Sequence, residues 1–316
     1  MVHRNYSPQD LKDLLCGVVV IMVTAYDDEM AVSAQRQSNH INFLIGGGLN
    51  EGKGVIVTTG SMGECSCLSW QERKLVLDAT LEAAAGRVPV LAGCNGTNIR
   101  EIIDMAQYAE RKGAAGIMLM SPYYWAPDNQ AVLDFFKEVA RNINIGIMLY
   151  NNLPIVRKDL SISLISELSR IENIAGIKEC TPNFFKFIDL IQAINDRLTV
   201  VNGNGEFWEP FAGLAGAKGF SSGFVNFAPQ VTMKMWKLRK KGDYKKAVEL
   251  RMKIAPVLKF WSTMVEKYGP SIEASVIKTA AVFAGSPLGD ARLPASRVNE
   301  EERAELKNLI GELEKV

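Results

Sequence analysis

Short apolar runs that alternate with segments of helical spacing are the feature that most restricts how this chain folds. The eight runs cover residues 18–24, 55–59, 88–93, 115–120, 145–151, 174–180, 198–203 and 218–223. Helical segments are expected over 30–44, from Ser69 onward, and over 98–112, 129–141, 161–169, 184–195 and 206–215. Strands buried on both faces and separated by helices predict a closed (β/α)8 TIM barrel.

The pattern changes after residue 229, where no further strand is expected. Helical spacing continues over 231–241, 243–264, 271–284 and 299–315, with a turn at Gly269-Pro270. The sequence therefore predicts two parts. Residues 1–229 form a barrel that carries the active site, and residues 230–316 form a C-terminal helical appendage.

Charge and hydropathy argue against two classes of partner. The chain has 316 residues, with 36 Lys and Arg against 35 Asp and Glu, so its net charge is +1. No basic excess favours nucleic acid or an anionic membrane as a partner. The basic run at 237–241 is expected to be the solvated face of a helix. The apolar run at 18–23 is too short to span a bilayer, and the N-terminus does not resemble a signal peptide.

Cysteine and histidine are too few and too scattered for a metal centre. The chain has five Cys and two His, and no Cys-x-x-Cys. An odd number of dispersed thiols argues against a disulfide scaffold and favours a reducing, cytoplasmic location. We expect no cofactor and no metal, and the scarcity of histidine argues against a metal-dependent barrel aldolase.

Lys178 is the first candidate catalytic residue because it ends the sixth apolar run. In a TIM barrel, side chains at the carboxyl ends of the strands form the active site. A lysine that is partly desolvated there is expected to have a lowered pKa, and its amine becomes a nucleophile toward a carbonyl. The alternative is a solvated lysine at a strand end.

Two further groups are expected at the same end of the barrel. Tyr150 ends the fifth apolar run, where its hydroxyl could relay protons, although a tyrosine of the core is the alternative. Ser61 follows the second run in a glycine-flanked loop and could orient Tyr150, or could be an ordinary turn serine. Free amides of that loop could hold a carboxylate.

Five segments together resemble the dihydrodipicolinate synthase/N-acetylneuraminate lyase family of class I, pyruvate-dependent aldolases. The resemblance extends from about Gly17 to Leu293. The segments are Gly-Ser-Met-Gly-Glu at 60–64, Pro-Tyr-Tyr at 122–124, Tyr-Asn-Asn-Leu-Pro at 150–154, Gly-Ile-Lys-Glu at 176–179 and Lys-Gly-Phe-Ser-Ser at 218–222.

This resemblance implies a Schiff-base lyase or synthase that condenses or cleaves pyruvate, or another 2-keto acid, and an aldehyde. Lys178 would form the imine and Tyr150 would transfer protons. Ser61 would connect Tyr150 to Tyr124, which in relatives comes from a neighbouring subunit of a homotetramer. The substrate-binding groups implied are the amides of Ser61 and Met62, the backbone at Ser221, and Arg157.

The sequence departs from the family in two places. Met62 replaces a second hydroxyl of the loop, and Leu153 is an extra residue before Pro154, which leaves the register of Arg157 open. Synthesis of the lysine precursor therefore competes with cleavage or dehydration of a 2-keto-3-deoxy sugar acid or an aromatic keto acid. A barrel that binds a keto acid without turnover is the alternative of another class.

Overall fold

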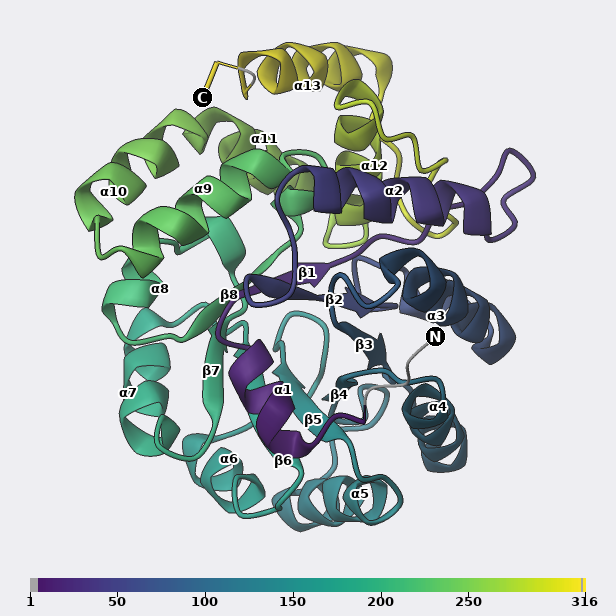
Figure 1. Ribbon diagram of the computed structural model, residues 1–316, viewed down its shortest axis with the longest axis vertical. Coiled ribbons are helices and arrows are strands. Elements are labelled where there is room, and N and C mark those ends of the chain that lie inside the picture. The colour runs from purple at the N-terminus through teal and green to yellow at the C-terminus, as the bar shows by residue number, and fades with distance from the viewer. Residues whose placement is uncertain (1–4, 314) are drawn as a thin grey trace.

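The computed structural model describes residues 5–313 and 315–316, and its core is the predicted closed barrel (Figure 1). Eight parallel strands pair in sequence order, and β8 closes against β1. The strands are β1 (Val18–Ile21), β2 (Gly54–Thr58), β3 (Val90–Gly93), β4 (Gly116–Met120), β5 (Gly146–Asn151), β6 (Ile174–Glu179), β7 (Thr199–Asn202) and β8 (Gly219–Ser222).

Helices surround the barrel and follow its strands in turn. They are α2 (Ala34–Gly46), α3 (Trp70–Ala84), α4 (Ile99–Arg111), α5 (Asn129–Arg141), α6 (Ile162–Leu168), α7 (Phe184–Ile194), α8 (Phe211–Leu214) and α9 (Pro229–Lys240). Helix α3 begins after Ser69, as expected, and Ser69 and Glu72 form a capping box there. Helix α2 begins at Ala34 rather than near residue 30, because the side chain of Ser33 caps it there.

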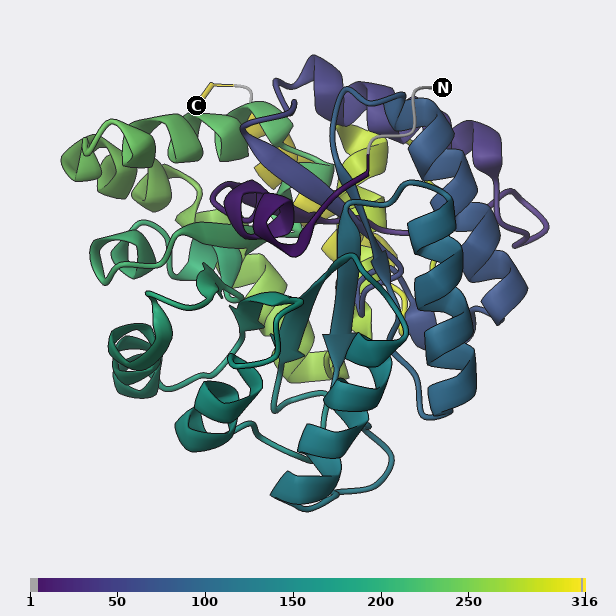
Figure 2. The same cartoon turned by 60° about the horizontal axis from the view of Figure 1, so that its bottom comes forward.

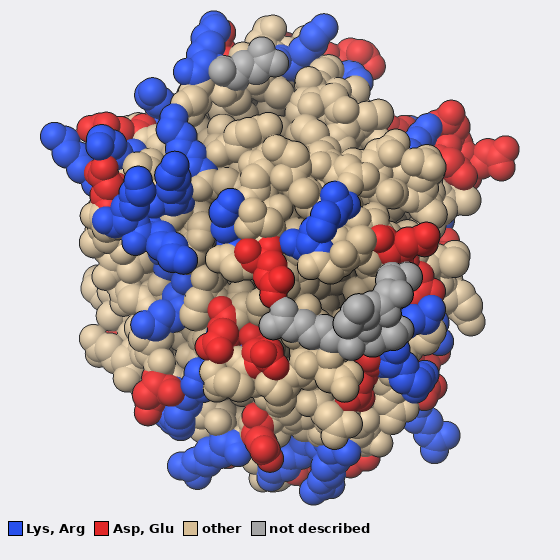
Figure 3. Space-filling view, in the orientation of Figure 1, with Lys and Arg blue, Asp and Glu red and all other residues tan. Residues whose placement is uncertain are grey.

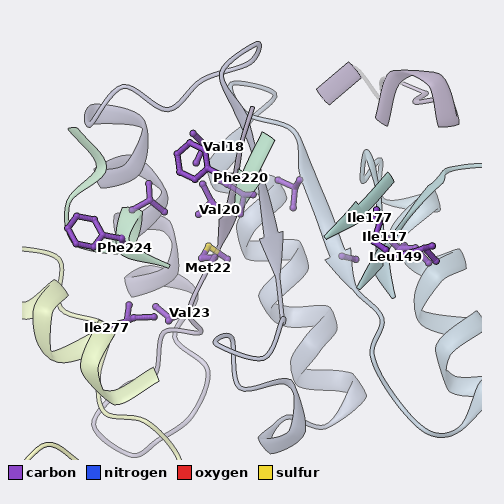
Figure 4. Close-up of a cluster of buried hydrophobic side chains, with 14 of the residues drawn as sticks. Val18, Val20, Met22, Val23, Ile117, Leu149, Ile177, Phe220, Phe224 and Ile277 are labelled. Atoms are coloured by element: carbon purple, nitrogen blue, oxygen red, sulfur yellow. The ribbon is translucent and has the colours of Figure 1, made fainter. Parts of the chain in front are cut away.

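Side chains along each strand alternate between two buried clusters. Figure 4 shows part of the outer cluster, where Val18, Val20, Leu149, Ile177 and Phe220 lie between the strands and the surrounding helices. Their neighbours in sequence face the barrel interior instead and form the inner cluster, which includes Val19, Ile21, Met148, Tyr150 and Val201. This two-residue period decides which strand-end side chains enter the barrel.

The amino end of the barrel is covered by a helix that the sequence did not predict. Helix α1 (Pro8–Leu14) contacts β5 and β6 and lies across the barrel in Figure 2. Its Leu11 side chain is fully buried, and a Cβ built on Gly116 or Gly146 would lie 2.7 Å from it. Glycine at these two positions therefore leaves the space that Leu11 occupies.

The C-terminal region is helical, as expected, but its elements differ from the prediction. The helices are α10 (Tyr244–Lys253), α11 (Ala255–Tyr268), α12 (Ile272–Phe283) and α13 (Glu300–Leu313). The single helix expected over 243–264 is two helices, because Pro256 at the start of α11 has no N–H to continue the bonding of α10. The helix expected over 206–215 is a 3-10 turn, Gly205–Phe207, and the short α8.

Helix α9 completes the alternation of strands and helices, yet it lies inside the region predicted as the appendage. The division at residue 229 stays a prediction. The basic run in α9 is only partly solvated, because Arg239 is buried and pairs with Glu209 at 3.0 Å. Figure 3 shows lysine and arginine gathered around α9 and α10, with acidic side chains among them. In the part of the chain that the structure describes, no helix is long and apolar enough to cross a membrane.

Candidate active site

The register of β5 and β6 places Tyr150 directly beside Lys178 at the carboxyl end of the barrel. The two residues are Cα partners in the parallel ladder, and both side chains face the interior. Lys178 is 4% exposed and Tyr150 is 2% exposed. The Nζ atom of Lys178 lies 4.1 Å from the centre of the Tyr150 ring. The alternative interpretation, a solvated lysine at a strand end, is therefore excluded.

Glu179, the next residue of β6, faces the opposite side of the strand. Its carboxylate accepts a hydrogen bond from Nδ2 of Asn151 at 2.8 Å and one from the backbone N–H of Thr181 at 2.7 Å. The alternation along β6 thus separates the two charges. Among the described residues, Lys178 has no ion-pair partner, which is rare for a buried ammonium group.

The loop after β2 brings Ser61 to the hydroxyl of Tyr150. Ser61 Oγ and Tyr150 Oη lie 3.2 Å apart, and Nδ2 of Asn152 donates to the same Oη atom at 2.8 Å. The backbone is tightly turned here, since a Cβ on Gly63 would lie 2.9 Å from the carbonyl oxygen of Met22. The backbone N–H groups of Ser61 and Met62 donate to no other described residue, so they are available to an anion.

Glu64 anchors this loop to the C-terminal helices. It has a positive φ of 57°, and its buried carboxylate forms an ion pair with Lys278 of α12 at 2.6 Å. It also accepts a hydrogen bond from the backbone N–H of Arg292 at 2.7 Å. Lys278 in turn lies over the ring of Tyr26, 4.0 Å from its centre. The loop that carries Ser61 is therefore held from outside the barrel.

One cavity of about 230 Å³ at the mouth of the barrel is lined by Lys178, Tyr150, Ser61 and Met62. Ser221 of β8 lines it as well, and its Oγ donates to the carbonyl of Gly203 at 3.0 Å. The polar lining is completed by Asn152, Cys180, Asn204, Glu206 and Glu273, and the apolar lining comes mainly from Ile21, Met62, Ile155, Phe207, Phe224, Leu258, Trp261 and Val265. The volume suits a small organic acid together with a short second substrate.

The pKa of Lys178 differs from the expectation. Burial acts to lower it, but the negative charges that Cys180, Tyr150 and Glu273 can carry act the other way, and the pKa is raised overall. The predicted lowering of the Lys178 pKa is therefore wrong in direction. Burial raises the pKa of Tyr150, while the nearby ammonium of Lys178 opposes that rise. An amine with a raised pKa attacks a carbonyl only after a neighbouring group has accepted its proton.

Two of the predicted site residues do not reach this cavity. The side chain of Tyr124 is 65% exposed in the loop between β4 and α5, where its ring packs edge to face against Trp125. Arg157 is exposed and lines no part of the cavity. The extra residue Leu153 lies in the turn that carries the chain away from β5 toward Arg157.

Asn152, Cys180 and Glu273 are among the cavity residues that were not predicted. Asn152 and Cys180 each follow a predicted site residue, Tyr150 or Lys178, by two positions, so the two-residue period of a strand could have identified them. Glu273 comes from α12, and only the tertiary structure brings it to the barrel. His40 lies elsewhere, buried in α2 with its ring nitrogens bonded to Ser286 and Asn226, and burial lowers its pKa to about 4.

Comparison with known families gives one match that spans almost the whole chain. Residues 14–313 match the dihydrodipicolinate synthetase family. A 4-hydroxy-tetrahydrodipicolinate synthase of Methanocaldococcus jannaschii is 31% identical over 300 residues, which cover 94% of this chain and 98% of that protein. The enzyme of the same name from Methanosphaerula palustris is 32% identical over 298 residues, which cover 93% and 98%.

Solved structures give the same result. A protein of Pseudomonas aeruginosa described as a putative dihydrodipicolinate synthetase superposes with a TM-score of 0.86 at 28% identity, over 94% of this chain and 99% of that chain. The prophage protein YagE of E. coli K12, described as belonging to the dihydrodipicolinic acid synthase family and solved in complex with pyruvate, gives a TM-score of 0.86 at 29% identity, over 94% and 98%.

Replacing Lys278 with methionine is expected to lower the free energy of unfolding by about 3–5 kcal/mol, because Glu64 would keep a buried charge without its partner. The measurement is urea unfolding followed by circular dichroism. Lys267→Met is the matched control, since Lys267 pairs with Glu302 but is half exposed and should lose only about 1 kcal/mol. Equal losses in the two variants would contradict the anchoring role of Glu64.

Proposed function

This chain belongs to the dihydrodipicolinate synthetase family, as its motifs predicted, and we propose that it joins or separates pyruvate and an aldehyde through an imine on Lys178. Enzymes of this family are pyruvate-dependent lyases and synthases, and this chain is one of them. The observation that carries the assignment to Lys178 is a buried lysine that has no ion-pair partner among the described residues. Its Nζ atom lies 4.1 Å from the centre of the Tyr150 ring, in a cavity that Ser61 also lines.

The reaction begins with attack of the neutral Lys178 amine on the ketone carbon of pyruvate. The nitrogen–carbon bond forms, and the carbonyl oxygen leaves as water with one proton from the amine and one supplied by Tyr150, so that a protonated imine remains. Loss of a proton from the pyruvate methyl group then gives an enamine. Its terminal carbon bonds to the aldehyde carbon, the aldehyde oxygen takes up a proton, and water hydrolyses the new imine to free Lys178. Cleavage is the same sequence reversed.

Tyr150 is the proposed proton carrier in these steps. Its hydroxyl accepts a hydrogen bond from Nδ2 of Asn152 and forms a second one with Oγ of Ser61, in which either oxygen can donate. The two bonds hold the phenol in one orientation near the amine. The ammonium of Lys178 stabilises the phenolate form, so a proton can pass from lysine to tyrosine and outward. Such general acid–base steps contribute typically about 10²–10⁴-fold to a rate.

The free amides of Ser61 and Met62 are the proposed site for the keto-acid carboxylate. Both N–H groups face no other acceptor among the described residues, and both residues line the cavity. Replacement of a loop hydroxyl by Met62 leaves this backbone donor in place. Ser221, on the opposite side of the same cavity, completes the proposed pyruvate pocket. Arg157 lies outside the cavity, so its contact with the second substrate stays a prediction.

Borohydride reduction in the presence of pyruvate is expected to attach to Lys178 the mass of pyruvic acid less one oxygen. Lys178→Ala should abolish this adduct, because no other lysine lines the cavity within the described part of the chain. Intact-protein and peptide mass spectrometry measure the result. Lys218→Ala, which removes an exposed lysine next to β8, is the control and should label fully. Labelling of Lys178→Ala at the wild-type level would disprove the imine.

Tyr150→Phe is expected to lower kcat by about 10²–10⁴-fold, because it removes the proton carrier and keeps the ring. Ser61→Ala should have a smaller effect, since Asn152 still orients the hydroxyl. Steady-state kinetics with the aldehyde that the wild type uses best measure both. A non-catalytic barrel that binds a keto acid predicts instead that pyruvate binds without turnover and that Tyr150→Phe changes nothing measurable.

A homotetramer in the cytoplasm is the proposed state of the protein. All five cysteines are free thiols, which supports a reducing compartment. The exposed rings of Tyr124 and Trp125 support a contact between subunits, since large aromatic side chains are enriched in interfaces. In such an assembly, Tyr124 of one subunit would extend the chain of hydroxyls from Tyr150 and Ser61 of another.

Sedimentation velocity at assay concentration is expected to show a species of four chains. Tyr124→Phe should keep that species and lower kcat by roughly tenfold or more, because only the relayed hydroxyl is lost. A fully active single chain in the sedimentation experiment would rule out a shared active site.

A further inference from the structure

Glu273 enters the cavity from outside the barrel. It lies in the first turn of α12, and Nε1 of Trp261 in α11 donates to its Oε1 atom at 3.3 Å. Both residues line the cavity that contains Lys178, Tyr150 and Ser61. Trp261 is its one hydrogen-bond partner among the described residues, and no cation pairs with it there. The carboxyl group therefore keeps bonding capacity for a molecule in the cavity.

The wall around Glu273 is apolar and lacks a second cation. Trp261 and Val265 of α11, together with Phe207 and Leu258, form this side of the cavity. Lys178 is the only basic residue in the lining, within the described part of the chain, and the proposed reaction uses it for the imine. Because Arg157 lies outside the cavity, a carboxylate on the second substrate would meet Glu273 and no positive partner in the described lining beyond Lys178.

The remaining acid of the lining, Glu206, is already occupied. Its Oε1 accepts hydrogen bonds from Ser222 at 2.6 Å and from Thr232 at 2.9 Å, and its side chain is 3% exposed. Glu206 therefore belongs to the wall between β8 and α9. Glu273 is the acid that a second substrate would contact.

Burial raises the pKa of Glu273 to about 7, while the bond from Trp261 and the charge of Lys178 act to lower it. The other titratable groups that line the cavity of Glu273 are Lys178, Cys180, Tyr150 and Glu206. Glu273 also lines a second cavity beside the loop of Ser61, where the titratable groups are Tyr123, Glu64, Cys65 and Cys67. The group thus changes charge near neutral pH. A keto-acid carboxylate bound nearby adds negative charge and therefore raises the pKa of Glu273 further.

We propose that Glu273 is a specificity-determining residue, which selects an uncharged aldehyde with a hydroxyl group as the second substrate and rejects an aldehyde that carries a carboxylate. This inference rests on the proposed function and adds the class of the second substrate to it. A hydroxyl donates to the ionised carboxyl group or accepts from the protonated one, so it is held in both states. A carboxylate is repelled once Glu273 ionises.

The test compares two aldehydes of equal shape, 4-(hydroxymethyl)benzaldehyde and 4-carboxybenzaldehyde, with aspartate semialdehyde as a third. The aromatic ring suits the wall of Trp261 and Phe207. Initial rates of product formation with pyruvate are followed by mass spectrometry from pH 6 to pH 9. The wild type should prefer the hydroxymethyl compound by roughly tenfold or more in kcat/KM, and the preference should grow as pH rises through the ionisation of Glu273.

Glu273→Gln keeps the shape and removes the charge. We expect it to reduce the preference by roughly tenfold and to abolish its dependence on pH. Trp261→Phe removes the N–H donor that lowers the Glu273 pKa, so the rise in preference should shift to higher pH. Glu266→Gln, at an exposed carboxylate of α11, is the matched control and should behave as the wild type. Circular dichroism confirms that each variant folds.

A wild-type preference for a carboxylate-bearing aldehyde, or an unchanged preference in Glu273→Gln, would overturn this assignment. Borohydride labelling of the wild type in the same preparation distinguishes failure of the Glu273 role from failure of the proposed imine chemistry. If pyruvate labels Lys178 and the preference does not respond to Glu273, only the role of Glu273 fails. If no label forms, the proposed function fails with it.

Discussion

The pairing of β5 with β6 is the constraint on which the rest of the site depends. Because Tyr150 and Lys178 are Cα partners, a parallel ladder places phenol and amine on the same side of the barrel wall. A shift of one residue in either strand would turn one of them into the outer cluster. Burial of a lysine without an ion pair is costly, and the surrounding packing of strands and helices maintains it. The stability of the whole barrel therefore offsets the free-energy cost of burying Lys178.

Helix α12 makes the C-terminal region part of the site. Lys278 holds Glu64 and with it the loop of Ser61, while Glu273, five residues earlier in the same helix, lines the cavity. One helix thus contacts both the proposed carboxylate pocket and the proposed second-substrate wall. Since the barrel strands supply Lys178 and Tyr150, the proposed chemistry and the proposed choice of substrate come from different parts of the chain. Changes in α11 and α12 could alter the substrate while the imine chemistry stays unchanged.

Features that depend on local sequence pattern were predicted from the sequence, whereas features that depend on contacts between distant residues were not. Strand periodicity located Lys178 and Tyr150, and glycine spacing located Ser61, because each lies at a strand end of a regular fold. Helix α1 was missed because it is short and largely polar, and Leu11 is the buried side chain by which it packs into the barrel. Glu273 had no local signal. The predicted lowering of the Lys178 pKa was wrong because Cys180, Tyr150 and Glu273 surround the amine and act against the effect of burial.

The most direct test of the account is a crystal structure of the protein grown or soaked with pyruvate. We expect continuous density from Nζ of Lys178 to the central carbon of pyruvate. The carboxylate should lie on the amides of Ser61 and Met62, and the methyl carbon should be directed toward Glu273. Pyruvate bound without a covalent link to Lys178, or bound away from this cavity, would contradict it.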